Sequence, residues 1–160
     1  MTAPAAALAP SRPSPEIDAR ALARELALRV SGEVRFDDGS RAAYASDASN
    51  YRQPPIGVVL PKSVDDIAAA VDICRKFGAP ILMRGGGTSQ NGQCVNVAVV
   101  IDTSKYLNRV LAIDARAKTA LVEPGVVCDA LRDAAEQHGL TFGPDPATHT
   151  AGNGQRHPRS

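Results

Sequence analysis

The feature that most restricts how this chain can fold is a glycine triplet standing between two strand-like runs. A short apolar run at 79–83 precedes Gly85-Gly86-Gly87, and valines that alternate along 95–101 follow it. Residues without a Cβ let backbone amides turn toward a ligand in conformations that other residues avoid. The loop therefore predicts an oxyanion site. Thr88 and Ser89 would add hydroxyl donors, and Arg84 would supply a positive charge that steadies the loop or neutralises a diphosphate.

Two better-known phosphate loops do not match this one. The chain has no Gly-x-x-x-x-Gly-Lys-[Ser/Thr] motif, and the triplet does not continue as Gly-x-Gly-x-x-Gly. Both of those loops also open a helix, whereas a strand is predicted here, so loop amides would bind the phosphate without a helix dipole. A Rossmann fold is disfavoured. A tight turn whose glycines only reverse the chain stays open as an alternative.

The part of the chain before the loop predicts helices on either side of a buried strand. Ser14 would cap an Ala/Leu-rich helix reaching about Val30, and the polar, turn-rich stretch 37–55 predicts an irregular connection. A strand is expected at 56–60. Ser63 would cap a helix ending near Phe77, which leads to a parallel strand at 79–83. The apolar positions of this helix at helical spacing are Val64, Ile67, Val71 and Cys74.

The part after the loop predicts a change to antiparallel pairing. Runs at 109–113 and 119–123 flank a polar connection, and a helix at 127–138 would place Val127, Leu131 and Ala135 on one face. The expected fold class is α+β, with a small parallel β-α-β subdomain followed by the start of a mixed or antiparallel sheet subdomain. The expected divisions are a flexible leader (1–14), a partial binding domain (15–149) and an unpacked tail (150–160).

Charge and cysteine content exclude several classes of function. The 18 basic and 17 acidic residues nearly cancel, so no broad positive field would hold a nucleic acid. Cys74, Cys94 and Cys128 are widely spaced, without the pairing of a zinc or redox site, which favours reduced thiols and a cytoplasmic location. No apolar run approaches the roughly 20 residues that span a bilayer.

From Tyr44 to His149 the sequence resembles the FAD-binding (PCMH-type) domain of the vanillyl-alcohol oxidase superfamily, especially its D-lactate and glycolate dehydrogenase branch. The resemblance implies that the 85–89 loop surrounds the FAD diphosphate, with Gly92 and Gln93 at its exit. The matching motifs, in order, are Val58-Val59-Leu60-Pro61, Arg84 to Gln93, Val100-Ile101-Asp102, Val122-Glu123-Pro124-Gly125 and Phe142-Gly143-Pro144-Asp145-Pro146-Ala147-Thr148.

Further roles follow from the same resemblance. Pro144, Pro146 and Thr148 would lie near the flavin, and Glu123-Pro124-Gly125 would end a strand against the cofactor region, although a plain strand-ending turn explains the latter equally well. Relatives with covalent flavin carry His where this loop has Thr88, which implies non-covalent FAD. His138 is interpreted as a helix-end residue, and whether His149 faces the flavin is left open.

The resemblance implies an enzyme that oxidises a 2-hydroxy acid, with hydride passing to flavin N5 and electrons to another acceptor. After His149 the chain departs from the family's Gly-Gly-x-Ile-Gly-x-Asn stretch, so we expect a truncated fragment that is inactive alone and binds FAD weakly or not at all. No catalytic residue is assigned. Self-association through an unfinished sheet edge is expected. The alternative is a non-catalytic module that binds another nucleotide or a partner with the same loop.

Overall fold

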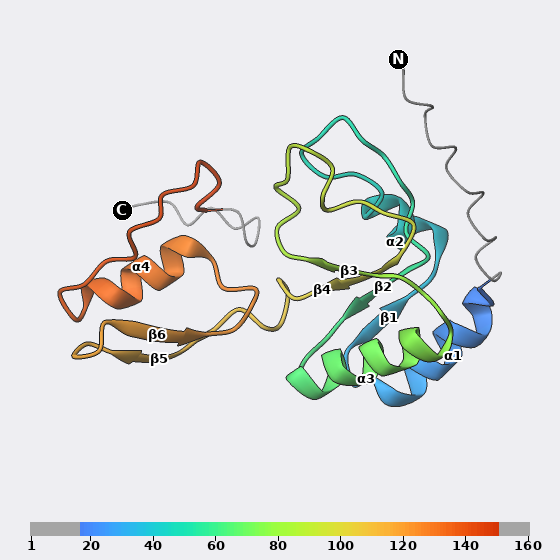
Figure 1. Cartoon of the computed structure of the whole chain (residues 1–160), viewed down its shortest axis with the longest axis horizontal. Coiled ribbons are helices and arrows are strands. Elements are labelled where there is room, and N and C mark those ends of the chain that lie inside the picture. The colour runs from blue at the N-terminus through green and yellow to red at the C-terminus, as the bar shows by residue number, and fades with distance from the viewer. Residues whose placement is uncertain (1–16, 151–160) are drawn as a thin grey trace, which may run out of the picture.

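The computed structural model describes residues 17–150, which form two groups of elements joined by the chain after the fourth strand (Figure 1). The first group contains α1 (Ala19–Arg29), β1 (Glu33–Arg35), α2 (Asp38–Ala43), β2 (Gly57–Leu60), α3 (Val64–Lys76), β3 (Ile81–Arg84) and β4 (Val99–Asp102). The second contains β5 (Val110–Asp114), β6 (Thr119–Val122) and α4 (Cys128–Glu136). The expected α+β class is confirmed.

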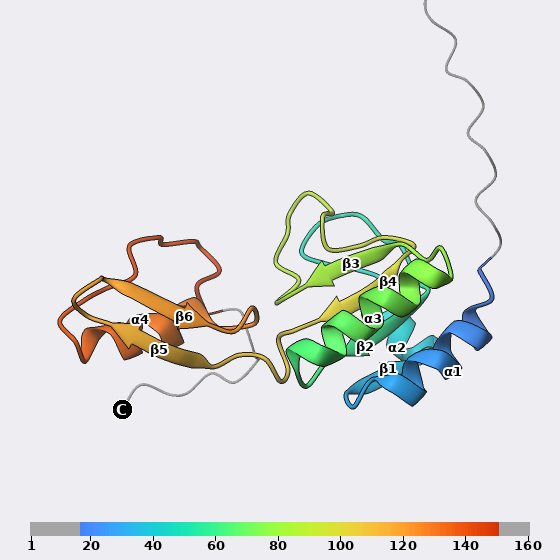
Figure 2. The same ribbon diagram turned by 60° about the horizontal axis from the view of Figure 1, so that its bottom comes forward.

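The first group is built on a four-stranded sheet of order β1-β2-β4-β3 (Figure 2). Strands β2, β4 and β3 are parallel, which confirms the β-α-β unit, and β4 lies between the two strands that α3 connects. The predicted strand over 95–101 is wrong at its start. Val97 is 56% exposed and the Val95 amide donates to the Gly92 carbonyl at 3.4 Å, so these valines belong to the loop.

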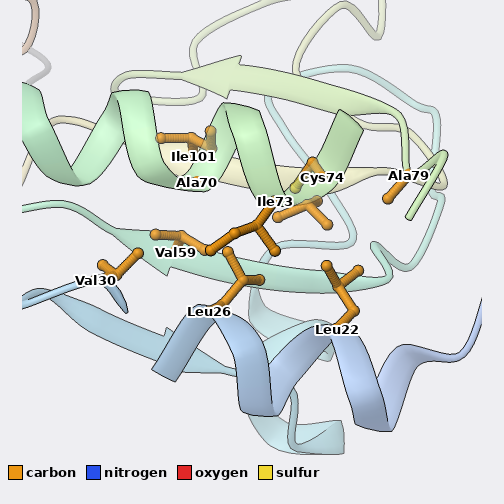
Figure 3. Packing of buried hydrophobic residues seen from close by; sticks show 10 residues of the cluster. Leu22, Leu26, Val30, Val59, Ala70, Ile73, Cys74, Ala79 and Ile101 are labelled. Atoms are coloured by element: carbon orange, nitrogen blue, oxygen red, sulfur yellow. The ribbon is translucent and has the colours of Figure 1, made fainter. Parts of the chain in front are cut away.

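Helices α1 and α3 pack side by side on one face of this sheet (Figure 3). The capping of α3 is as predicted, since the Ser63 hydroxyl accepts a hydrogen bond from the Asp66 amide at 3.1 Å. The predicted buried face is partly wrong, because Val64 and Val71 are 70% and 39% exposed. Asp66 turns inward instead, accepting hydrogen bonds from the Lys62 and Ser31 amides, both at 2.8 Å. The buried residues of α3 are Asp66, Ala70, Ile73 and Cys74.

Three features near the start of the chain differ from expectation. Helix α1 begins at Ala19, and the Asp18 carboxylate caps it by accepting hydrogen bonds from the Arg20 and Ala21 amides. The predicted cap Ser14 lies outside the described residues, as do the predicted leader and residues 151–160 of the predicted tail. The stretch 37–55 contains α2, capped by Asp37. Strand β1 was not predicted, and it pairs antiparallel with β2 because the chain returns along that edge.

The second group is the predicted antiparallel hairpin with one helix packed on it. Its connection bends at Lys118, which has a φ of 54°. Leu131 and Ala135 of α4 are buried, as expected, and Val127 caps the helix rather than continuing its face. Leu111 and Leu121 stay 50% and 63% exposed. Within residues 17–150, no helix is both long and apolar enough to cross a membrane.

Candidate functional site

The glycine loop begins at the carboxyl end of β3, at the edge of the parallel sheet from which the chain leaves for the second group (Figure 1). Arg84, the last residue of β3, is the register partner of Asp102 in β4, and its carbonyl accepts a hydrogen bond from the Thr103 amide at 3.1 Å. Ligands of open parallel sheets bind beyond the carboxyl ends of the strands. The loop therefore lies where the topology favours a ligand.

The backbone amides of the loop are not used by the protein itself. Within residues 17–150, none of the N–H groups from Gly85 to Ser89 donates a hydrogen bond, whereas the Gly87 carbonyl accepts one from the Ala48 amide at 3.1 Å. A Cβ built on Gly85 would meet no atom within 4 Å, and this glycine does not have a positive φ. Nothing within the described chain therefore requires glycine at position 85, which fits a position that a ligand approaches closely.

Arg84 takes the first of its two predicted roles, because its guanidinium holds the loop closed. It donates to the carbonyls of Cys94 at 2.9 Å, Ser46 at 3.0 Å and Tyr44 at 3.4 Å, and it lies 5.2 Å from the centre of the Tyr44 ring. Within residues 17–150 no carboxylate forms a salt bridge with it. The loop thus encloses a guanidinium that forms no salt bridge within the described part of the chain.

Tyr44 is in turn held in place by the buried carboxylate of Asp102. Its hydroxyl donates to the Asp102 carboxylate at 2.6 Å, and Asp102 is only 6% exposed. Burial, followed by the hydrogen bond to Asp102, raises the pKa of Tyr44 far above its usual range, so the phenol stays protonated and keeps donating. The ring is therefore a rigid platform under the guanidinium.

Further contacts shape the rest of the loop. The Asp47 carboxylate accepts from the Cys94 amide at 3.2 Å, and Gly92, with a φ of 78°, lies so close to Tyr51 that a Cβ would come 2.7 Å from its ring. The Ser89 hydroxyl donates to the Gln93 side chain and accepts from the Gln93 amide at 3.2 Å. Ser89, Gly92 and Gln93 thus set the loop's shape, while the structure gives the Thr88 hydroxyl no partner within residues 17–150.

The segment Glu123-Pro124-Gly125 closes the hairpin of the second group. The Glu123 carboxylate accepts from the Arg109 amide at 2.8 Å and from its guanidinium, also at 2.8 Å, and these bonds lower the pKa of Glu123. A Cβ on Gly125 would come 2.3 Å from the Thr103 carbonyl oxygen, so packing requires glycine there. This geometry fits the strand-ending turn that the sequence left open.

Pro144, Pro146 and Thr148 are exposed on the segment that follows α4. His149 does not stand free, because its Nδ1 lies 2.8 and 2.9 Å from the two carboxylate oxygens of Asp129. His138 lies just beyond the end of α4 as expected, where its backbone amide donates to the Ala135 carbonyl at 2.9 Å.

The structure brings Arg84 to Gln93 together as one loop but joins no predicted residue of the second group to it by a hydrogen bond within residues 17–150. The residues that support the glycine loop and the segment after α4 were not identified from the sequence. Asp47-Ala48-Ser49 carried a turn signal, since the Ser49 amide donates to Asp47 at 2.9 Å, and Asp129 and Arg132 were spaced to meet on one helix face. The missed residues are Tyr44, Ser46, Asp47, Tyr51, Asp129 and Arg132.

Comparisons with known proteins match a region of the chain that includes this loop. The family described as FAD binding domain matches residues 55–153. Glycolate oxidase subunit GlcD of Bacillus subtilis (strain 168) is 35% identical over 129 residues, covering 78% of this chain and 27% of that protein. D-2-hydroxyglutarate dehydrogenase of Pseudomonas putida is 34% identical over 123 residues, covering 73% of this chain and 12% of that protein.

A solved structure of alkyldihydroxyacetonephosphate synthase resembles the fold with a TM-score of 0.72 at 23% identity, and the likeness covers 83% of this chain and 27% of that one. The chain therefore spans about a quarter or less of the length of these relatives. The family match includes the glycine loop, the hairpin and the segment after α4. The chain belongs to the FAD binding domain family.

Proposed function

We propose that this chain binds FAD without a covalent bond, and that the backbone amides from Gly85 to Ser89 hold the diphosphate. The observation that carries the proposal is that these N–H groups have no acceptor within the described residues, while the Arg84 guanidinium beside them forms no salt bridge there. Amides and a fixed cation are suited to phosphate oxygens. Thr88 supports the non-covalent part, because a threonine hydroxyl does not replace the imidazole that links covalent flavins.

The binding that this loop alone supplies is modest. About four amide-to-phosphate contacts at about 1.5–3 kcal/mol each give roughly 6–12 kcal/mol. Association costs an estimated 4–15 kcal/mol of rigid-body freedom. The two nearly cancel, so we expect weak binding by these 160 residues and rely on assays that detect a weak complex.

We further propose that the complete protein oxidises a small 2-hydroxy acid of the D-lactate or glycolate type. The names of the relatives support this, since they include a glycolate oxidase subunit, D-2-hydroxyglutarate dehydrogenases and a D-lactate dehydrogenase. Bound FAD would supply the redox chemistry by accepting hydride. The described residues contribute cofactor binding, and we assign none of them a catalytic role. The family match does not favour the alternative of a non-catalytic module.

An equilibrium titration with FAD, FMN and ATP tests the proposal. We expect FAD to bind best, with quenched flavin fluorescence, because only FAD presents a diphosphate joined to a flavin. Equal binding of all three ligands, or none at concentrations up to solubility, would contradict FAD as the cofactor. The control variant is Arg116→Met, because it changes only an exposed charge in the hairpin connection. Gly125→Ala is not a suitable control, because a Cβ at that position would disturb the packing.

Two further expectations stay predictions. We propose a reducing compartment such as the cytoplasm, which is supported by three free cysteines, of which Cys74 is buried with its pKa raised to about 11 by burial. Self-association through the β5–β6 hairpin is supported by the exposure of Leu111 and Leu121. Size measured by light scattering over a range of protein concentration tests it, and a constant monomer mass would contradict it.

A further inference from the structure

The segment from Phe142 to His149 has no helix or strand of its own, yet it follows a defined path beside α4 (Figure 1, red). All residues from 141 to 148 are exposed, so burial of apolar side chains does not hold the segment in place. Most of the contacts that hold it come from two charged side chains near the start of α4, Asp129 and Arg132, and the Cys128 thiol adds a weak one to the Pro144 carbonyl at 3.9 Å.

Arg132 holds the first half of the segment. Its guanidinium donates to the Phe142 carbonyl at 3.3 Å, to the Pro144 carbonyl and to the Asp145 carboxylate at 2.8 Å. Its Nη1 lies 3.4 Å from Asp129, and the Arg132 side chain is only 18% exposed. A planar guanidinium can serve several acceptors in fixed directions, so one side chain defines the path of several residues.

Asp129 holds the second half. Its carboxylate oxygens lie 2.8 and 2.9 Å from His149 Nδ1, and its backbone amide donates to the His149 carbonyl at 3.4 Å. Amides in the first turn of a helix have no helical acceptor, so the His149 carbonyl satisfies one of them. The His149 amide donates to the Pro146 carbonyl at 3.0 Å, which closes the turn that contains Thr148. The hydrogen bond from His149 lowers the pKa of Asp129.

We propose that Asp129 and Arg132 are positioning residues that hold segment 142–149 in the shape in which it faces the cofactor. The inference rests on the proposed function in one respect, because the segment contains the three residues expected near the flavin: Pro144, Pro146 and Thr148. Charged side chains link the His149 imidazole to Asp145. The Asp129 carboxylate contacts the imidazole, and the Arg132 guanidinium forms salt bridges with both Asp129 and Asp145.

Hydrogen exchange followed by NMR on the full 160-residue chain tests the holding contacts without any cofactor. Two amides, called the segment amides here, report the contacts of the segment: that of Asp129 in α4, which donates to the His149 carbonyl, and that of His149. The Leu131 amide, which donates to the Val127 carbonyl, reports α4 itself. In Arg132→Met we expect about tenfold or greater acceleration at the two segment amides, because charged hydrogen bonds are lost, and no change at Leu131. The matched variant Arg116→Met should change none of them.

The Leu131 amide separates positioning of the segment from general support of the helix. His149→Leu, which removes the contact of the imidazole with the Asp129 carboxylate, should accelerate exchange at the Asp129 amide and leave Leu131 unchanged. Unchanged exchange at the segment amides in Arg132→Met overturns the proposal, and so does acceleration at Leu131 equal to that at the segment amides. If Arg132→Met does not fold, Arg132→Lys keeps the charge and should show a smaller acceleration.

The cofactor part is read separately by FAD titration. Arg132→Met should weaken FAD binding at least about fivefold and alter the visible flavin spectrum of the complex, with Arg132→Lys intermediate. Faster segment exchange with unchanged FAD binding would overturn the proposal, since the segment would then not face FAD. Absence of FAD binding by the wild-type chain would refute the proposed function, and the exchange experiment would still decide whether Asp129 and Arg132 hold the segment.

Discussion

A methyl group added at Gly87 should destabilise the fold, whereas one added at Gly85 of the same loop should leave stability unchanged and weaken FAD binding. Gly87 has a φ of 66°, and a Cβ there would lie 2.5 Å from Arg84 Nη2 and 3.0 Å from Cζ. The left-handed backbone costs alanine about 1–2 kcal/mol, and displacing the guanidinium loses at least one charged hydrogen bond worth about 1.5–3 kcal/mol. We therefore expect Gly87→Ala to lower the free energy of unfolding by about 2.5–5 kcal/mol.

Gly85→Ala is the matched control, because a Cβ there meets no atom within 4 Å. The free energy of unfolding of Gly85→Ala should stay within about 0.5 kcal/mol of the wild-type value. FAD binding should weaken at least about tenfold, because the methyl group would occupy the space that we assign to the phosphate. Urea unfolding followed by circular dichroism measures both stabilities. Equal destabilisation by the two variants, or full FAD binding by Gly85→Ala, would refute the account of the loop.

Three further changes test the core, a surface ion cluster and the loop arginine. Leu26→Ala should lower the free energy of unfolding by about 2–5 kcal/mol in urea, because Leu26 is fully buried, whereas Leu28→Ala on the same helix, 80% exposed, should change it by less than about 0.5 kcal/mol. The hydrogen bond from Lys105, above all, lowers the pKa of Glu33 from 4.5 to about 2, so the stabilisation by Glu33 should be complete above pH 4.5 and be lost as pH falls toward 2. Glu33→Gln should therefore make the loss of stability with falling pH less steep in acid unfolding curves, and an unchanged slope would contradict this. Arg84→Lys should weaken FAD binding nearly as much as Arg84→Met, about tenfold, because lysine cannot serve three carbonyls at once, and retention of affinity by the lysine variant would show that charge alone suffices.

Local signals predicted most of the regular structure. Ser63 marked the start of α3, the polar stretch 114–118 marked the hairpin, and the spacing of Leu131 and Ala135 marked the buried face of α4. These features depend on neighbours within a few residues, so the sequence alone contains them. The buried face of α3 does not depend on near neighbours alone, because the Asp66 side chain turns inward and accepts a hydrogen bond from Ser31, which lies 35 positions earlier.

The candidate site was predictable in position but not in its internal supports. The glycines and the strand before them located the loop at the sheet edge. The role of Arg84 depends on carbonyls 38 and 40 positions away, at Ser46 and Tyr44, which only the fold brings near. On the helix, Asp129 and Arg132 had the spacing of an ordinary solvent-exposed ion pair, and only the path of the following segment reveals their contacts.

The measurement that tests the central claim most directly is an NMR titration of the isotopically labelled chain with FAD, ADP and riboflavin, which detects even millimolar affinity. We predict that FAD and ADP, which carry the diphosphate, shift the amide resonances of Gly85 to Ser89, and that riboflavin, which lacks it, leaves those resonances in place. Shifts caused equally by riboflavin, or shifts by FAD that miss this loop, would contradict the claim that its free amides hold the diphosphate.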